Sequence, residues 1–285
     1  MTNTKQWSSA TPGYIIFLVD QSGSMKENYR DGKTKAEYTA LVINRTINTL
    51  IFTNAAGEKI KDRVFISLIG YGGKGGNSVD DLRSDYLSKF ADVPLRIEKI
   101  KKKVPDGAGG LVEVEEEMPI FLEPIANGLT PMGDALSFAK QLIEGWIQKK
   151  PDNPAPIIIN VSDGMPYNGN QSTPTEEMDK TITAANNIMA ITTNDGNPLI
   201  FNAHIGEGIG KKIELAENES ELGGDEMAQI LFKISSKVPD AYKAAAIKQE
   251  LNVKDSSKGF VSNADPETLI KFINFGSSGG TDKIG

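Results

Sequence analysis

Short apolar segments that alternate with amphipathic segments are the main pattern along this chain. The strongest apolar run has the sequence YIIFLV, at residues 14–19, and gives way to polar residues at Asp20. A continuous apolar, β-branched run of this length, ended by small polar residues, predicts a buried parallel strand with a turn at its carboxyl end. Comparable runs predict further strands at residues 63–71, 157–161, 198–205 and 260–261.

Between these runs, apolar residues recur at the spacing of a helix face. One such segment begins with the capping-box pattern TKAE at residues 34–37 and extends to about Phe52. The same spacing predicts further helices at residues 132–147, 175–191, 224–236, 239–251 and 265–275. Strands that alternate with helices predict an α/β fold, a doubly wound, Rossmann-like and mostly parallel sheet flanked by helices.

One segment departs from this alternation because its charge changes sign. Residues 95–104 are basic, residues 105–110 have the composition of a turn, and residues 111–118 are acidic. The pattern predicts an added β-hairpin at 95–118 in which Lys side chains face Glu side chains across the ladder. We interpret the charges as protection of a solvated edge against aggregation, and a charged docking surface is the alternative.

Bulk properties limit the classes of protein. We predict a single domain at residues 13–275, after a polar lead-in at 1–12 and before a flexible tail at 276–285. The net charge is −7, and no basic patch with interleaved aromatic residues is present, so we expect no nucleic-acid partner. The absence of cysteine excludes disulfides and thiolate catalysis. Neither a signal peptide nor an apolar run of about 18 residues is found, so we expect a cytoplasmic protein without membrane contact.

Candidate metal ligands follow the predicted strands. Asp20, Ser22 and Ser24 alternate directly after the first strand, so their side chains can converge on one side of the chain. Asp163 follows a second buried strand, and Thr130 lies at a predicted helix start. In open α/β sheets, ligands bind outside the carboxyl ends of the strands, so both carboxylates are expected on the same rim. Carboxylate and hydroxyl oxygens form a hard ligand set that suits Mg²⁺ or a similar cation.

Three motifs carry a family resemblance. The sequence DQSGSM at residues 20–25 resembles the D-x-S-x-S motif of von Willebrand factor A domains. The Thr in GLTPMGDAL, at 128–136, and the Asp in VSDGMP, at 161–166, match the other two parts of the metal-ion-dependent adhesion site of that family. The resemblance implies the von Willebrand factor A fold over about 13–275, in a bacterial protein of cytosolic type. It also implies an intact metal site, some of whose ligands act through water, formed by Asp20, Ser22, Ser24, Thr130 and Asp163.

The resemblance also implies a function. The cofactor is expected to be Mg²⁺, or Mn²⁺ or Ca²⁺, and the partner another protein that supplies an acidic residue to the metal. The protein is then a non-enzymatic protein–protein interaction module. Similar bacterial proteins are often encoded beside kinases and phosphatases or in stress and defence operons, which implies an adaptor or scaffold in a stress or signalling system. A secreted or surface adhesin of the same fold is the alternative.

Each candidate ligand also has an ordinary structural explanation. Asp20 and Ser22 are common in turns, and Asp163 precedes a glycine, as in many turns. Thr130 precedes Pro131, a combination typical of a helix N-cap without any metal. The metal-site hypothesis therefore depends on the three motifs occurring together.

Enzymatic alternatives fit the sequence less well. A metal-dependent phosphohydrolase of haloacid-dehalogenase type needs a second acid two residues after its nucleophilic Asp, where this chain has Ser22. The glycine pattern from Gly70 to Gly75 fits a dinucleotide fingerprint formally, but no helix is predicted directly after it. His204 is the only histidine, and we expect it to be partly buried and structural.

Two further features stay open at this point. Met25 and Met165 lie beside the predicted metal rim and are candidates for an exposed apolar margin that a partner contacts. No motif assigns a role to residues 205–262.

Overall fold

The computed structural model describes residues 3–30, 32–105, 111–169, 172–206 and 211–278, so most of the predicted tail and the turn of the charged hairpin lie outside it. Its core is a seven-stranded sheet with the strand order β12-β13-β11-β10-β1-β6-β7. The inner strands are parallel to one another, and β7 and β12 add antiparallel edges. The strands are β1 (Gly13–Asp20), β6 (Val64–Tyr71), β7 (Val79–Tyr86), β10 (Ile157–Ser162), β11 (Leu199–His204), β12 (Ile213–Glu214) and β13 (Phe260–Ser262).

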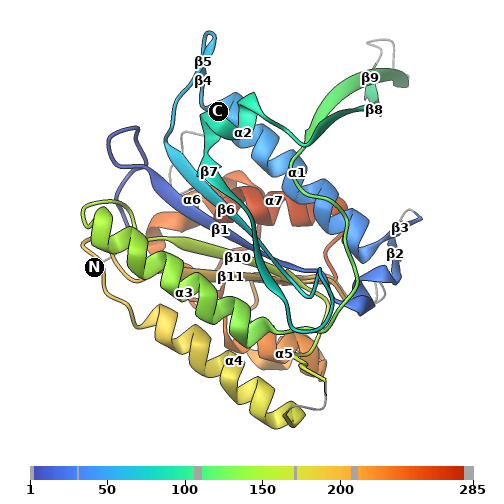
Figure 1. The fold of residues 1–285 in the computed structure, drawn as a ribbon, viewed down its shortest axis with the longest axis vertical. Coiled ribbons are helices and arrows are strands. Elements are labelled where there is room, and N and C mark those ends of the chain that lie inside the picture. The colour runs from blue at the N-terminus through green and yellow to red at the C-terminus, as the bar shows by residue number, and fades with distance from the viewer. Residues whose placement is uncertain (1–2, 31, 106–110, 170–171, 207–210, 279–285) are drawn as a thin grey trace.

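Helices cover both faces of this sheet (Figure 1). Successive apolar side chains of a strand point to opposite faces of the sheet. Each face packs against its own set of helices, so the core consists of two clusters. The first cluster involves α1 (Lys35–Thr53), α2 (Leu87–Asp92), α6 (Asp240–Lys248) and α7 (Pro266–Gly276). The second involves α3 (Met132–Lys149), α4 (Pro174–Met189) and α5 (Glu226–Lys233). This arrangement confirms the predicted α/β fold with its mostly parallel sheet.

The predicted capping box sets the start of α1. The Thr34 hydroxyl accepts a hydrogen bond from the Glu37 backbone N–H at 3.2 Å, and the Glu37 carboxylate accepts one from the Thr34 N–H at 2.8 Å. These bonds satisfy two N–H groups that would otherwise lack partners in the first turn. They fix α1 beside the loop that follows β1.

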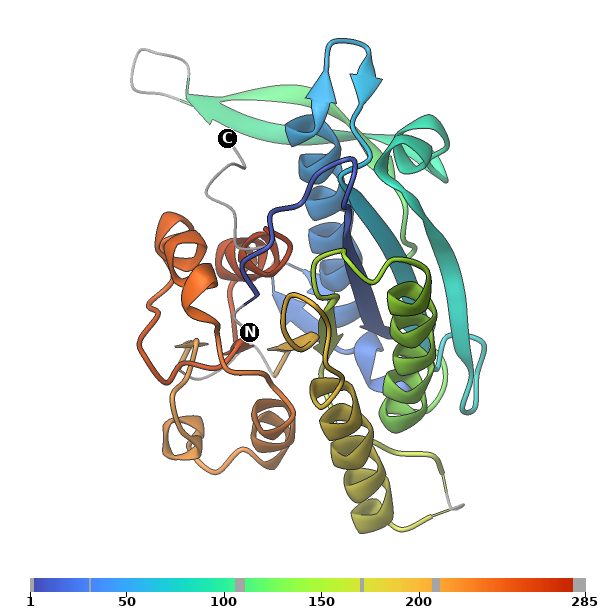
Figure 2. The ribbon, with the colours of Figure 1, turned by 90° about the vertical axis from the view of Figure 1, so that its left-hand side faces the viewer.

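The charged hairpin is present, as predicted, as β8 (Arg96–Pro105) and β9 (Leu111–Ile120). It forms a separate two-stranded sheet that projects past α1, away from the main body (Figure 2). Its register places Lys99 opposite Glu117, and the Lys99 ammonium lies 3.6 Å from the Glu115 carboxylate. Lys99 and Glu115 are both largely exposed, so the pair lies in solvent.

Several elements differ from the prediction. The sequence pattern did not indicate α2 or the small hairpins β2–β3 (Asn28–Arg30, Lys33–Thr34) and β4–β5 (Ala55–Ala56, Lys59–Ile60). The described part of the lead-in is bound to the domain, since Asp195 accepts hydrogen bonds from the backbone N–H groups of Thr4 and Lys5. Within the described ranges, no helix has both the length and the apolar composition needed to cross a membrane.

Candidate metal-binding site

Sheet register brings the two candidate carboxylates to one rim. Strands β1 and β10 are parallel neighbours in which Val19 lies opposite Val161. Asp20 ends β1 and Asp163 follows Ser162 at the end of β10, so both carboxylates lie at the carboxyl edge of the sheet, as expected. The Ser162 hydroxyl donates a hydrogen bond to the Asp20 carboxylate at 2.5 Å and thereby joins the two strand ends.

Hydroxyl groups connect the two carboxylates. The Ser22 backbone N–H donates to Asp20 at 2.9 Å, and the Ser22 and Ser24 hydroxyl oxygens lie 3.1 Å apart. The Ser24 hydroxyl then donates to Asp163 Oδ1 at 2.9 Å. A short 3₁₀ turn, η1 (Gly23–Lys26), gives the serines this arrangement. Four of the five predicted ligands therefore form one hydrogen-bonded chain.

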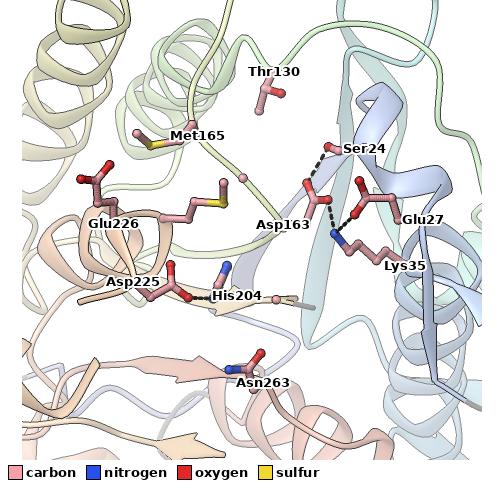
Figure 3. A pocket seen from close by; sticks show the side chains of 13 residues that line it. Ser24, Glu27, Lys35, Thr130, Asp163, Met165, His204, Asp225, Glu226 and Asn263 are labelled. Atoms are coloured by element: carbon pink, nitrogen blue, oxygen red, sulfur yellow. Dashed lines mark hydrogen bonds and ion pairs between the residues drawn. The ribbon is translucent and has the colours of Figure 1, made fainter. Parts of the chain in front are cut away.

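The fifth predicted ligand, Thr130, reaches the same place from a different loop. The Gly23 N–H donates to the Gly128 carbonyl at 2.8 Å, which holds this loop beside the serine motif. Gly72, with a φ of +83°, makes room for the loop, since a Cβ there would lie 2.2 Å from the Leu129 carbonyl oxygen. Thr130 lines a cavity together with Ser24 and Asp163 (Figure 3).

The helix-cap explanation of Thr130 is wrong. Helix α3 begins at Met132, Pro131 occupies the N-cap position, and no side chain caps the helix. The Thr130 backbone instead exchanges hydrogen bonds with Tyr167 at 2.8 and 2.9 Å. Its hydroxyl has no hydrogen bond within the part of the chain that the structure describes. A side chain that is 7% exposed and points into the cavity is thus available to a ligand.

A buried lysine, which the sequence analysis missed, completes the rim. The Lys35 ammonium donates to Asp163 Oδ2 at 2.8 Å and to the Glu27 carboxylate at 2.7 Å. Burial lowers the pKa of Lys35, but the hydrogen bonds to Asp163 and Glu27 outweigh burial and raise it above its ordinary value. Lys35 is therefore a permanent positive charge beside Asp163. No sequence signal distinguishes it from an ordinary exposed lysine in a first helical turn.

Asp20 lies in an environment that opposes its negative charge. Burial and then the charge of Asp163 raise its pKa to about 6, against the lowering effect of the hydrogen bonds from Ser162 and Ser22. The protein alone therefore does not fully compensate the negative charge of ionised Asp20. A divalent cation would compensate that charge. No group of three or more His, Cys, Asp or Glu in the described ranges is placed to hold a metal. A site here must combine two carboxylates with hydroxyl oxygens, a set that fits Mg²⁺ chemically.

The cavity beside these residues has a volume of about 590 Å³. Ser24, Thr130 and Asp163 form one side, and Figure 3 shows Met165, Asp225 and Glu226 on the other. Asp225 and Glu226 belong to the segment at 205–262 that the sequence left without a role. The fold brings these two acidic residues close to the candidate metal ligands, and no local sequence pattern predicts this proximity.

The two methionines of the predicted apolar margin have different environments. Met25 is fully buried in the core, so its assignment to the margin is wrong. Met165 lines the cavity.

His204, which we expected to be partly buried, is fully buried at the end of β11 and also lines the cavity. Its Nδ1 lies 2.8 Å from the Ser262 hydroxyl and 3.9 Å from the Asp225 carboxylate. Burial lowers its pKa, while the charge of Asp225 acts in the opposite direction. The Nε2 atom is buried and makes no hydrogen bond to the described residues.

Solved structures share this fold, although no family model and no curated protein matches the sequence. The pilus adhesin SpaC from Lactobacillus rhamnosus GG matches 96% of this chain with 16% identity and a TM-score of 0.50. The PilB minor pilin from Streptococcus sanguinis matches 95% with 11% identity and a TM-score of 0.50. The vWF domain of the type V pili tip protein Mfa5 from Porphyromonas gingivalis matches 57%, with 16% identity and a TM-score of 0.32.

The chain spans only part of each of these proteins, namely 31% of SpaC, 61% of PilB and 42% of the Mfa5 domain. At such low identity the likeness to SpaC and PilB establishes the α/β fold alone. The prediction of a cytoplasmic protein is nevertheless contradicted, because the two matches that cover nearly all of this chain are a pilus adhesin and a minor pilin, which belong to surface structures. That prediction relied on the polar residues at 1–12 and on the absence of cysteine, and neither feature determines location.

Proposed function

We propose that this chain is a metal-dependent protein-binding module of the surface-adhesin type. In this proposal, Asp20, Ser22, Ser24, Thr130 and Asp163 hold a divalent cation, Mg²⁺ in the first instance, as in the von Willebrand factor A domains that the motifs resemble. A partner protein then supplies an acidic side chain to the cation. The pilus proteins that share the fold favour an adhesin over a cytosolic adaptor.

The convergence of hydroxyls and carboxylates at the cavity is the observation that carries the proposal. A serine hydroxyl that donates its hydrogen to a carboxylate keeps oxygen lone pairs free for a cation, and Ser24 is bonded to Asp163 in this way. Thr130 adds, on the same cavity, a hydroxyl that makes no hydrogen bond to the described residues. Three neutral oxygens and two carboxylates leave a bound divalent cation electron-poor, so it retains affinity for one external carboxylate.

Each residue has a distinct role in this mechanism. Asp163, which lines the cavity, faces the ligand, whereas Asp20 is buried and supplies negative charge from below the accessible surface. Lys35 orients Asp163 by holding its Oδ2 oxygen, and Ser24 holds the Oδ1 oxygen. When bound, the cation supplies the Lewis-acidic position that accepts the partner's carboxylate.

Binding accounts for this geometry better than phosphohydrolysis does. Both Asp20 oxygens accept hydrogen bonds, from the Ser22 N–H and the Ser162 hydroxyl, and the residue is only 1% exposed. A nucleophilic carboxylate must reach its substrate, and Asp20 does not line the cavity. Ser22 occupies the position that an acid–base catalyst would need.

Titration calorimetry with Mg²⁺ and Mn²⁺ tests the proposal. We expect the wild type to bind either ion and Asp163→Asn to lose binding at least tenfold, because a neutral amide replaces one of two anionic ligands. Asp179→Asn, which changes an exposed acid on α4 outside the cavity, is the matched control and should bind as the wild type does. Equal binding by Asp163→Asn and the wild type would overturn the proposal.

A further inference from the structure

The side of the cavity that faces the metal rim is acidic. Asp225 caps helix α5, where its Oδ1 atom accepts the Ala228 N–H at 3.0 Å, and its other oxygen is turned toward His204. Glu226 is exposed and has no ion pair within the described ranges. The lysine of the cavity, Lys35, already pairs with Asp163 and Glu27. The acidic side therefore lacks a positive partner in the described part of the protein.

A second polar group on the same side is also placed to contact a bound molecule. His204 points into the cavity from β11 (Figure 3), and its Nε2 atom is buried without a hydrogen-bond partner. Buried polar atoms are rarely left unsatisfied, because the loss of water is then not compensated. A polar group of a ligand in the cavity would supply the missing bond.

The acidic side continues into a second cavity of about 340 Å³ between α4 and α5. Met165 and Glu226 line both cavities, so Glu226 lies between the two. The apolar part of its walls comes from Met165, Met178, Ile182 and Ile230, and the polar part comes from Glu219, Glu226, Gln229 and Lys233. Two neighbouring cavities that share lining residues offer room for an extended peptide segment rather than for a single side chain.

We propose that the partner binds as an extended segment with two opposite charges, an acidic side chain for the metal rim and a basic side chain for Asp225 and Glu226. This inference rests on the proposed function and extends it, because it names the second residue type that the partner must carry. Charge complementarity selects the basic side chain, since Asp225 and Glu226 present two carboxylates on this side of the first cavity. The acidic pair also repels a partner whose segment is acidic throughout, which gives selectivity among carboxylate ligands.

Selection from a display library of random linear peptides on the immobilised full chain, in Mg²⁺, tests the inference. Bound peptides are eluted with EDTA and sequenced. The main variant is Asp225→Asn with Glu226→Gln, in which Asn keeps the helix cap and both charges are removed. The matched control is Asp265→Asn with Glu267→Gln in the first turn of α7, where Asp265 caps the helix in the same way, at 2.8 Å from the Thr268 N–H.

We expect the wild type and the control to select peptides that carry both an acidic and a basic residue. The main variant should retain the acidic residue and lose enrichment of the basic one, and a wild-type peptide should bind it about fivefold more weakly. Glu226→Gln alone, at an exposed position without an ion pair among the described residues, should show part of this loss even if the double variant folds poorly.

Two results overturn the inference, and they differ in what else they overturn. Acidic peptides that EDTA releases, without enrichment of basic residues on the wild type, would contradict the inference and leave the proposed function intact. A failure of the wild type to select any EDTA-released acidic peptide would contradict both.

Discussion

The proposed metal rim, formed by Asp20, Ser22, Ser24, Thr130 and Asp163 with Lys35 beside them, and the β8–β9 hairpin both contain charged residues, yet in opposite environments. At the rim, Lys35 and Asp163 are buried and 2.8 Å apart. On the hairpin, Lys99 and Glu115 are exposed and 3.6 Å apart. Removing one partner of a buried pair leaves an uncompensated charge in the interior, whereas water replaces the partner of an exposed charge. The comparison shows that environment, rather than the number of charges, determines what a charged residue contributes.

The largest effect is expected at Lys35. In EDTA, Lys35→Met should lower the free energy of unfolding by about 4 kcal/mol, because Asp163 then remains buried without its counter-charge. Urea denaturation measures the change, and subsequent addition of Mg²⁺ should recover part of it. Lys26 is an exposed lysine nearby, and the free energy of unfolding of Lys26→Met should stay within about 0.5 kcal/mol of the wild-type value. Equal losses in the two variants would show that the rim behaves like ordinary surface.

Asp20 should make the stability of the rim depend on pH. Its pKa in the folded protein, about 6, is above the ordinary value of 3.8, so the proton favours the folded state. The stabilisation is complete below about pH 4 and is lost as the pH rises through about 6. Asp20→Asn lacks this titrating group. In EDTA, the free energy of unfolding of Asp20→Asn minus that of the wild type should therefore be about 3 kcal/mol larger at pH 8 than at pH 4. Urea denaturation at both pH values measures this, and parallel pH profiles would contradict it.

The smallest effect is expected on the hairpin. Lys99→Ala and Glu115→Ala should each change the free energy of unfolding by less than about 0.5 kcal/mol, because solvent and salt screen the pair. The same urea denaturation assay measures both. A loss comparable to that of Lys35→Met would show that the hairpin, too, contributes strongly to stability, and the contrast between the two regions would then fail.

Local sequence predicted the parts of the fold that depend on local patterns. The YIIFLV run became β1, and the Thr34–Glu37 capping box starts α1. The charge change predicted the β8–β9 hairpin. Helix α2 was missed because its six residues, with only Leu87 and Phe90 buried, are too few to establish a helical period.

The candidate site was predicted where strand ends and motifs coincide, and missed where the fold brings distant residues together. Asp20 and Asp163 follow apolar runs, so their common rim could be derived from parallel strands. Lys35 has the sequence context of an exposed helical lysine, and its burial depends on α1 lying against the end of β10. Asp225 and Glu226 come from a short helix with no motif of its own. Their place across the cavity depends on the packing of α5 beside β11, which no local pattern records.

The position of β1 has a mechanical consequence. This strand lies between β10 and β6 and runs parallel to both, with its amino end continued by residues that are bound to Asp195. A tensile force on the segment before Gly13 would first have to detach that segment and would then pull β1 lengthwise. Lengthwise pulling loads the hydrogen bonds to both neighbours together, in shear, rather than opening them one after another. The strand that ends at the proposed metal rim is therefore also placed to resist tension.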